Sequence, residues 1–480
     1  MNHSIIRYIL GLVLRFEAVF LLVPCIVAIV YQERAGWAYA LVALVCFVLG
    51  TLVTRKRPEN LLYFAREGFV TVSLSWIVMS IFGAIPFVLC GDIPSFTDAL
   101  FETISGFTTT GASILPEVES LNHCSLMWRS FTHWVGGMGV FVFLLAVMPM
   151  AGGYNMHLMR AESPGPSVSK LVPKVRDTAK ILYGIYFAMT LIEFILLLIA
   201  KMPLFDAIAT AVGTAGTGGF GIKNDSMAGY SMTIQGIVTV FMILFGVNFN
   251  AYFIILLAKN KKDVFKIEEV KWYFGIIITT IVIITYNIRH MFGSLFEAFH
   301  HAAFQVGSVI TTTGFATTDF DLWPQLSKSL LVMIMFVGAC AGSTGGGIKV
   351  SRIIILLKTV KQEMIYFVHP RSVKTIKLDG KALDHETVRD VSAFMVTYVI
   401  IFAISFLILA FDNLDMVTNF TAVTATINNI GPGLELVGPT RNFALFSPVA
   451  KYVLMFDMLA GRLELFPLLL LFTPSVWKKG

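Results

Sequence analysis

Long runs of apolar residues dominate the chain and predict membrane-spanning helices. A helix needs about 20 mostly apolar residues to cross the hydrocarbon core of a bilayer. Candidate spans lie at 8–30, 37–54, 68–90, 125–149, 179–200, 232–258, 272–289, 327–368, 391–411 and 446–475. The eighth run holds a glycine-rich break, and the tenth is long enough to tilt or kink. The pattern therefore predicts an all-α polytopic membrane protein.

Four shorter apolar stretches lie in the loops between later spans, at 95–107, 203–214, 295–309 and 414–427. They are too short to cross the membrane, and apolar segments of this length can be re-entrant. Non-helical backbone at membrane depth is tolerated only where protein buries it or where it lines a water-filled cavity. We therefore expect four half-helices that enter the membrane from one face and return to it.

The four short stretches share a motif that closes on a glycine. The first reads Phe101-Glu-Thr-Ile-Ser-Gly-Phe-Thr-Thr-Thr-Gly111, and the third reads Phe304-Gln-Val-Gly-Ser-Val-Ile-Thr-Thr-Thr-Gly314. The second and fourth close on Gly219 and Gly431. Each stretch lies between two spans, which predicts four pseudo-symmetric repeats of span, pore helix, filter loop and span around a central pore. The expected divisions are a two-helix preface (1–60) and repeats at 61–160, 161–265, 266–385 and 386–480.

Composition supports a membrane protein and excludes other classes. Hydrophobic residues make up 56% of the chain and charged residues only 14%, whereas soluble proteins average about 25% charged residues. A soluble enzyme, a disordered chain and a nucleic-acid binder are thereby excluded. The five cysteines are scattered, which excludes a disulfide scaffold or a cysteine-based zinc site.

Charge sorts the loops onto two sides. Bases gather after the second, fourth, sixth and eighth spans, for example at 55–57, 170–180, 259–271 and 349–389, whereas 91–123 has acids and no Lys or Arg. The positive-inside rule then places both termini in the cytoplasm. The run at 8–30 is too long for a signal-peptide core and is interpreted as a retained first span.

The four glycine loops have the chemistry of an alkali-cation site. The C-terminal end of each half-helix carries a partial negative charge, and backbone carbonyls can replace the hydration shell of an ion. Glycine accepts the positive φ that such a turn requires. No carboxylate or imidazole cluster suggests a transition metal. The candidate filter residues are Thr109, Thr110, Gly111, Thr217, Gly218, Gly219, Thr312, Thr313, Gly314, Asn429, Ile430 and Gly431.

The layout resembles the TrkH/KtrB/HKT superfamily of potassium transporters, and the TrkH branch in particular. TTTGAS at 108–113, TGGF at 217–220, TTTGF at 311–315 and NNIGPG at 428–433 resemble its four filter loops. The segment 128–142 resembles its first post-filter helix, and the two-span preface is a trait of the TrkH branch. The second loop is richer in glycine than the first and third, which predicts an asymmetric filter.

The glycine-rich break in the eighth run predicts a loop within the membrane. Gly338, Gly342, Gly345, Gly346 and Gly347 fall within ten residues, and each glycine costs a helix about 1 kcal/mol relative to alanine. The segment lacks the order of a Walker A loop, because Ile348 separates Gly347 from Lys349. One interpretation is a flexible bend between two half-helices. The family resemblance implies a mobile gate below the filter.

Arg462 lies in the last span, where a charge costs about 2.5–3.5 kcal/mol unless it meets water or a partner. The resemblance implies a pore-facing cation barrier below the filter. The alternative is an ion pair with Asp457 or Glu464. Arg129 follows Trp128 near the outer interface, and we interpret it as snorkelling to the headgroups.

The resemblance implies potassium uptake across the bacterial inner membrane by a homodimer that assembles with cytosolic TrkA-like nucleotide-binding subunits. K⁺ is then the transported ion, and the only other expected partner is membrane lipid. No organic cofactor is expected, because the chain has no GxGxxG motif that opens a βαβ unit. The alternative is a Na⁺-permeable transporter or a cation/proton symport system of the same fold. An enzyme is not expected, because no catalytic spacing of His, Asp, Glu or Ser appears within the spans.

Overall fold

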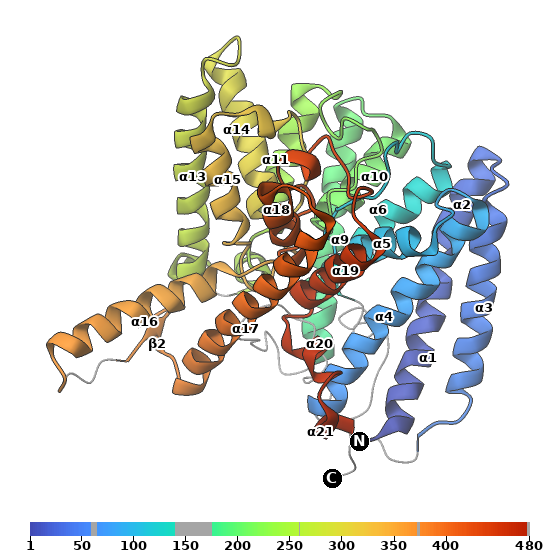
Figure 1. The fold of residues 1–480 in the computed structure, drawn as a ribbon, viewed down its shortest axis with the longest axis horizontal. Coiled ribbons are helices and arrows are strands. Elements are labelled where there is room, and N and C mark those ends of the chain that lie inside the picture. The colour runs from blue at the N-terminus through green and yellow to red at the C-terminus, as the bar shows by residue number, and fades with distance from the viewer. Residues whose placement is uncertain (59–64, 140–174, 259, 372–374, 478–480) are drawn as a thin grey trace.

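The computed structural model describes residues 1–58, 65–139, 175–258, 260–371 and 375–477. This part of the chain is almost entirely helical, as Figure 1 shows. Its one sheet is an antiparallel pair of two-residue strands, β1 (Lys377–Leu378) and β2 (Lys381–Ala382). The predicted end of the fourth span and the basic loop after it lie outside the described residues.

Three helices form the preface, α1 (His3–Phe20), α2 (Leu22–Tyr31) and α3 (Gly36–Thr54). A Cβ on Gly50 would lie 2.7 Å from the carbonyl oxygen of Gly11, so α1 and α3 meet backbone to backbone. Glu33 joins this unit to the next one, because its carboxylate accepts from the backbone N–H groups of His123 (2.7 Å) and Cys124 (2.9 Å). Burial raises the pKa of the Glu33 carboxyl, but these hydrogen bonds lower it, and the net shift is downward.

The remaining helices follow the predicted fourfold order of span, short helix, loop and second helix. The first two units contain α4 (Ala65–Cys90), α5 (Phe96–Phe107) and α6 (His123–Met138), then α9 (Val175–Ile199), α10 (Leu204–Ala215), α11 (Met232–Phe245), α12 (Phe249–Leu257) and η1 (Lys261–Lys266). The third contains α13 (Glu268–Ile288), α14 (Leu295–Ile310), η2 (Phe320–Leu322), α15 (Gln325–Met335) and α16 (Val350–Val368). The fourth contains α17 (His385–Leu409), η3 (Ala410–Asp412), α18 (Met416–Ile427), η4 (Glu435–Val437), α19 (Pro448–Arg462), α20 (Phe466–Leu470) and α21 (Pro474–Trp477).

The short helices α5, α10, α14 and α18 begin at clear helix-start signals. Ser95, Ser294 and Asp415 cap α5, α14 and α18 with side-chain hydrogen bonds to backbone N–H groups of the first turn, as favoured N-cap residues do. α10 instead follows Pro203. An acid stands in the first turn of α5, α10 and α14, where it interacts favourably with the helix dipole.

Several predicted spans are interrupted rather than continuous. Among the described residues, six helices are long and apolar enough to cross a membrane, or seven if the bent pair α11–α12 counts as one. This pair turns by 91° at residues 246–248. The helices that follow the glycine loops, α6, α11, α15 and α19, are all short, with 16, 14, 11 and 15 residues. The break in the eighth run was predicted from its glycines. The run at 232–258 does not reveal its bend, because its hydrophobicity continues across it.

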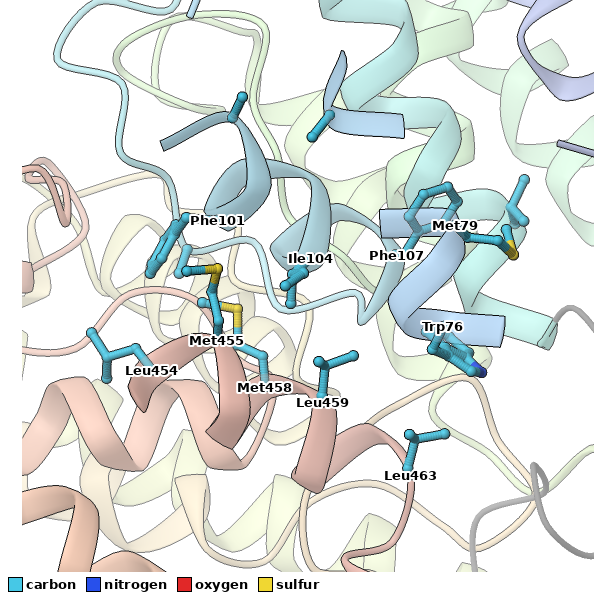
Figure 2. Close-up of a cluster of buried hydrophobic side chains, with 14 of the residues drawn as sticks. Trp76, Met79, Phe101, Ile104, Phe107, Leu454, Met455, Met458, Leu459 and Leu463 are labelled. Atoms are coloured by element: carbon cyan, nitrogen blue, oxygen red, sulfur yellow. The ribbon is translucent and has the colours of Figure 1, made fainter. Parts of the chain in front are cut away.

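The fourth unit closes back onto the first. In Figure 2, Leu454, Met455 and Met458 of α19 face the side of α5 that carries Phe101 and Ile104. These side chains are buried. Because lipid is also apolar, close packing rather than a hydrophobic driving force stabilises this contact. The start of α1 and the last helix, α21, lie at the same end of the bundle, away from the short helices (Figure 1).

Candidate functional site

Each of the four short helices ends in the same backbone motif. The residue after each C-cap has a left-handed φ, with values of 55° at Thr109, 51° at Thr217, 59° at Thr312 and 54° at Asn429. The N–H groups of these residues and of their successors both bond back into the helix; for example, Thr110 N–H donates to Ser105 O at 2.8 Å, and Thr313 N–H to Ser308 O at 2.8 Å. This is the Schellman arrangement. Non-glycine residues rarely adopt such a φ, so its fourfold occurrence marks four equivalent, specifically built turns.

The glycine two residues further on is also left-handed in every loop. Its φ is 77° at Gly111, 80° at Gly219, 88° at Gly314 and 97° at Gly431. Glycine adopts such angles without a steric penalty because it has no Cβ. The predicted anchoring glycines therefore occupy the positions at which the chain turns back outward.

The four loops touch one another in a closed ring. A Cβ on Gly111 would overlap the carbonyl oxygen of Gly218, and one on Gly219 would overlap that of Thr313. In the same way, a Cβ on Gly314 would overlap Ile430 O, and one on Gly431 would lie 2.7 Å from Thr110 O. The contacts run through the loops in sequence order and return to the first. The twelve candidate filter residues are thus brought together around one centre.

A solvent-open cavity of about 140 Å³ lies against this ring, and all four glycines contribute to its lining. The charged side chains that line it are Arg129, Lys223 and Arg441. The acids Asp98, Asp206 and Glu297 are not among its lining residues. The first of them forms an ion pair instead, since Lys451 Nζ lies 2.6 Å from the Asp98 carboxylate.

The glycine-rich segment 338–347 packs directly against the third and fourth glycine loops. Gly346 N–H donates to Thr312 Oγ1 at 2.7 Å. A Cβ on Gly345 would lie 2.9 Å from Thr311 O, and one on Gly346 would lie 2.7 Å from Asn429 Cβ. Gly338, Gly342 and Gly347 have left-handed φ values of 64°, 68° and 69°. The segment is therefore an ordered loop between α15 and α16 that packs against two of the glycine loops.

Arg462, at the end of α19, contacts this loop. Its guanidinium donates to Thr344 O (2.8 Å) in the loop and to Gly136 O and Gly137 O (2.8 Å) near the end of α6. The two acids weighed as its partners bond elsewhere. Glu464 forms an ion pair with Arg352, and Asp457 accepts a hydrogen bond from Ser405 at 2.7 Å.

Two further buried charges that the sequence analysis missed hold the same loop. Lys349 Nζ donates to the carbonyl oxygens of Gly345 and Gly346, the latter at 2.7 Å. Glu269 Oε1 accepts from Ala341 N–H (2.7 Å) and from Ser351 N–H (3.0 Å). A signal was present, because an ionisable residue inside or beside an apolar run is a functional-site candidate by default.

Arg129 does not snorkel to the interface, so that interpretation was wrong. Its side chain is 2% exposed, and its Nε lies 2.8 Å from Glu102 Oε1. The cause is Glu102 itself, a buried acid on the neighbouring helix α5 that requires a counter-charge. An acid within an otherwise apolar half-helix was the available sequence signal.

Comparisons with known proteins identify the family of the chain. A family model described as "TrkH: Cation transport protein" matches residues 37–479. The chain belongs to the TrkH family. The Trk system potassium uptake protein TrkH of Salmonella typhimurium is 38% identical over 487 residues, with both chains covered completely. The Trk system potassium uptake protein TrkG of Escherichia coli K12 is 31% identical over 488 residues, again with full coverage of both chains.

The solved structures include a TrkH-family member with the same architecture. The crystal structure of the potassium transporter TrkH from Vibrio parahaemolyticus matches with a TM-score of 0.89 and 35% identity, and the match covers 100% of both chains. The predicted resemblance and the all-α repeat architecture are therefore confirmed. The TrkH family consists of cation transporters rather than enzymes.

Proposed function

We propose that this protein takes up potassium ions across the bacterial cytoplasmic membrane through a filter formed by its four glycine loops. The observation that carries the proposal is the closed ring of Gly111, Gly219, Gly314 and Gly431 against the carbonyl oxygens of neighbouring loops. The relatives named potassium uptake proteins support the choice of ion.

In the proposed filter, backbone oxygens of the twelve candidate residues replace the water around K⁺. The short helices end at these loops, and the partial negative charge at their C-terminal ends favours a cation there. The left-handed turns fix the oxygens in advance. An ion then enters a preformed site, so its binding does not cost conformational entropy of the loops.

We further propose that the loop 338–347 is the gate. It lies against the filter through Gly346 and is held by Arg462 from one side and by Glu269 from the other. With the loop in this position, the guanidinium also places a positive charge near the ion path, which opposes cation passage. Opening then requires the loop to leave Thr312 and Arg462.

The assembly we propose is a homodimer bound to cytosolic TrkA-like subunits that carry the nucleotide site. Both termini would face the cytoplasm, and the repeat boundaries would follow the divisions given by the sequence. In proteoliposomes, we expect nucleotide to change the flux only when such a subunit is added. A nucleotide response of the chain alone would contradict the proposal that the nucleotide site lies on the cytosolic subunits.

The test of the proposed function is ion flux. Purified protein in proteoliposomes should transport K⁺ and Rb⁺, and a tenfold excess of Na⁺ should compete weakly. Equal permeation of Na⁺ would favour the second candidate, a Na⁺-permeable transporter, to which the unlike sequences of the four loops point. Dependence of K⁺ flux on a proton gradient would identify symport. Absence of cation flux in the presence of the regulatory subunit would contradict both.

A further inference from the structure

Helix α6 presents two polar side chains, one turn apart, to the second filter loop. His133 is fully buried and uses both ring nitrogens. Its Nδ1–H donates to Gly106 O of α5 at 2.8 Å, and its Nε2 accepts from Phe220 N–H of loop 2 at 3.2 Å. These two bonds fix one neutral tautomer. His133 therefore ties filter loop 2 to the pore helix of the preceding repeat.

Arg129 holds the same loop from one turn closer to the outer face. Its Nη1 donates to Gly221 O at 3.1 Å, and its guanidinium carbon lies 4.2 Å from the centre of the Phe220 ring. The His133 ring lies 4.3 Å from the same ring. Glu102 fixes Arg129 and also accepts from Ile114 N–H, just beyond loop 1, at 3.0 Å. The cluster thus joins the chain segments that follow Gly111 in loop 1 and Gly219 in loop 2.

His133 also accounts for the excess of glycine in loop 2. A Cβ on Gly216 would overlap the backbone of His133, and a Cβ on Gly218 would overlap its ring. Neither glycine has a left-handed φ, so their backbone conformations would accept alanine. The corresponding positions in the other loops carry side chains, and these residues are Thr108 and Thr110, Thr311 and Thr313, and Asn428 and Ile430.

The packing between loops 4 and 1 differs from that between loops 1 and 2. Gly136 of α6 and Gly461 of α19 occupy matching places, because a Cβ on either would overlap the last carbonyl of its own pore helix, Phe107 O or Ile427 O. His133 and Met458 each lie three residues before these glycines, so they occupy equivalent positions in α6 and α19. Met458 lies in the apolar cluster of Figure 2. The buried histidine of α6 thus has an apolar counterpart in α19.

We propose that His133, held in place with Phe220 by the Arg129–Glu102 pair, is a positioning residue that sets the geometry of filter loop 2 and thereby the discrimination between K⁺ and Na⁺. The inference rests on the proposed filter function. His133 does not touch the ion. It acts through the backbone of loop 2, whose carbonyl at Gly218 lies against Gly111 in the ring.

The first test is the Rb⁺/Na⁺ flux ratio of His133→Ala in proteoliposomes with equal amounts of folded protein. Loss of the bond to Phe220 should lower the ratio about fivefold, which corresponds to one net hydrogen bond of about 1 kcal/mol. Met458→Ala is the matched control, since it removes buried volume but no side-chain hydrogen bond to a filter loop. A purely structural role would lower both fluxes together and leave the ratio unchanged.

The second test uses steric compensation, and it remains decisive if the first variant folds poorly. Gly218→Ala should abolish flux because its methyl group meets the His133 ring, and adding His133→Ala should restore flux to the level of the single His133→Ala variant. Gly219→Ala should not be rescued, because its conflict is with backbone. Rescue of both or of neither would overturn the inference, as would an unchanged ratio in His133→Ala. A wild-type protein without Rb⁺/Na⁺ preference would instead overturn the proposed filter.

Discussion

Gly219→Ala should reduce Rb⁺ uptake in proteoliposomes at least tenfold. Gly219 has a φ of 80°, and the added Cβ would overlap the carbonyl oxygen of Thr313. Left-handed backbone costs an L-residue about 1–2 kcal/mol, and the overlap must in addition displace a carbonyl of the ring. Because about 1.4 kcal/mol in a barrier corresponds to a factor of ten, the two effects together should stop most transport.

The matched control for this variant is Gly236→Ala in α11. Gly236 has no atom within 4 Å of its added Cβ, and its backbone is helical. Alanine there should leave uptake unchanged and stabilise the helix slightly. Uptake by Gly219→Ala at the level of this control would show that the ring of glycines does not form the ion path.

Arg462→Ala should raise the basal flux, measured without a regulatory subunit, about tenfold or more. The guanidinium donates to Thr344 O of the loop and to two carbonyls of α6. A hydrogen bond from a charged donor contributes about 1.5–3 kcal/mol. Loss of one such bond from the closed state would shift the balance between the closed and open states by about tenfold or more. The loss of the positive charge would act in the same direction.

Two further variants separate these effects. Arg462→Lys keeps the charge but not the planar fork that reaches three carbonyls, so an intermediate flux would assign part of the block to loop anchoring. Arg289→Ala removes an exposed arginine at the C-terminal end of α13 and should behave as wild type. If Arg462→Ala does not increase basal flux, the loop is not held shut by this residue.

The sequence predicts the architecture well because four copies of one pattern reinforce each other. Thr-Thr-Thr-Gly at 108–111 and at 311–314 sets the register, and the other two loops then align on single glycines. The left-handed turns at Thr109, Thr217 and Thr312 could not be predicted, because threonine does not favour this conformation. Only the structure shows that they recur at equivalent positions.

Buried polar partnerships were the part of the site that the pattern of residues could not provide. In the sequence, Arg129 resembles an interfacial arginine. Its partner Glu102 lies on a different helix and comes beside it only in the fold. Glu269 and Ala341 are likewise separated in sequence but joined in space. Such pairs depend on which helices become neighbours, and a single sequence does not specify that. The bend between α11 and α12 depends on tertiary contacts in the same way, whereas the glycines of the eighth run predicted its break.

Under the proposed gating, the hydrogen bond from Gly346 to Thr312 would distinguish the closed state from the open one. With the loop in its observed position, the Thr312 hydroxyl already accepts a hydrogen bond from Gly346 N–H. Withdrawal of the loop frees that oxygen for a passing ion or for water. If the loop is the proposed gate, the loop and the permeant ion compete for the Thr312 hydroxyl, and raising the internal cation concentration should by itself favour the open form.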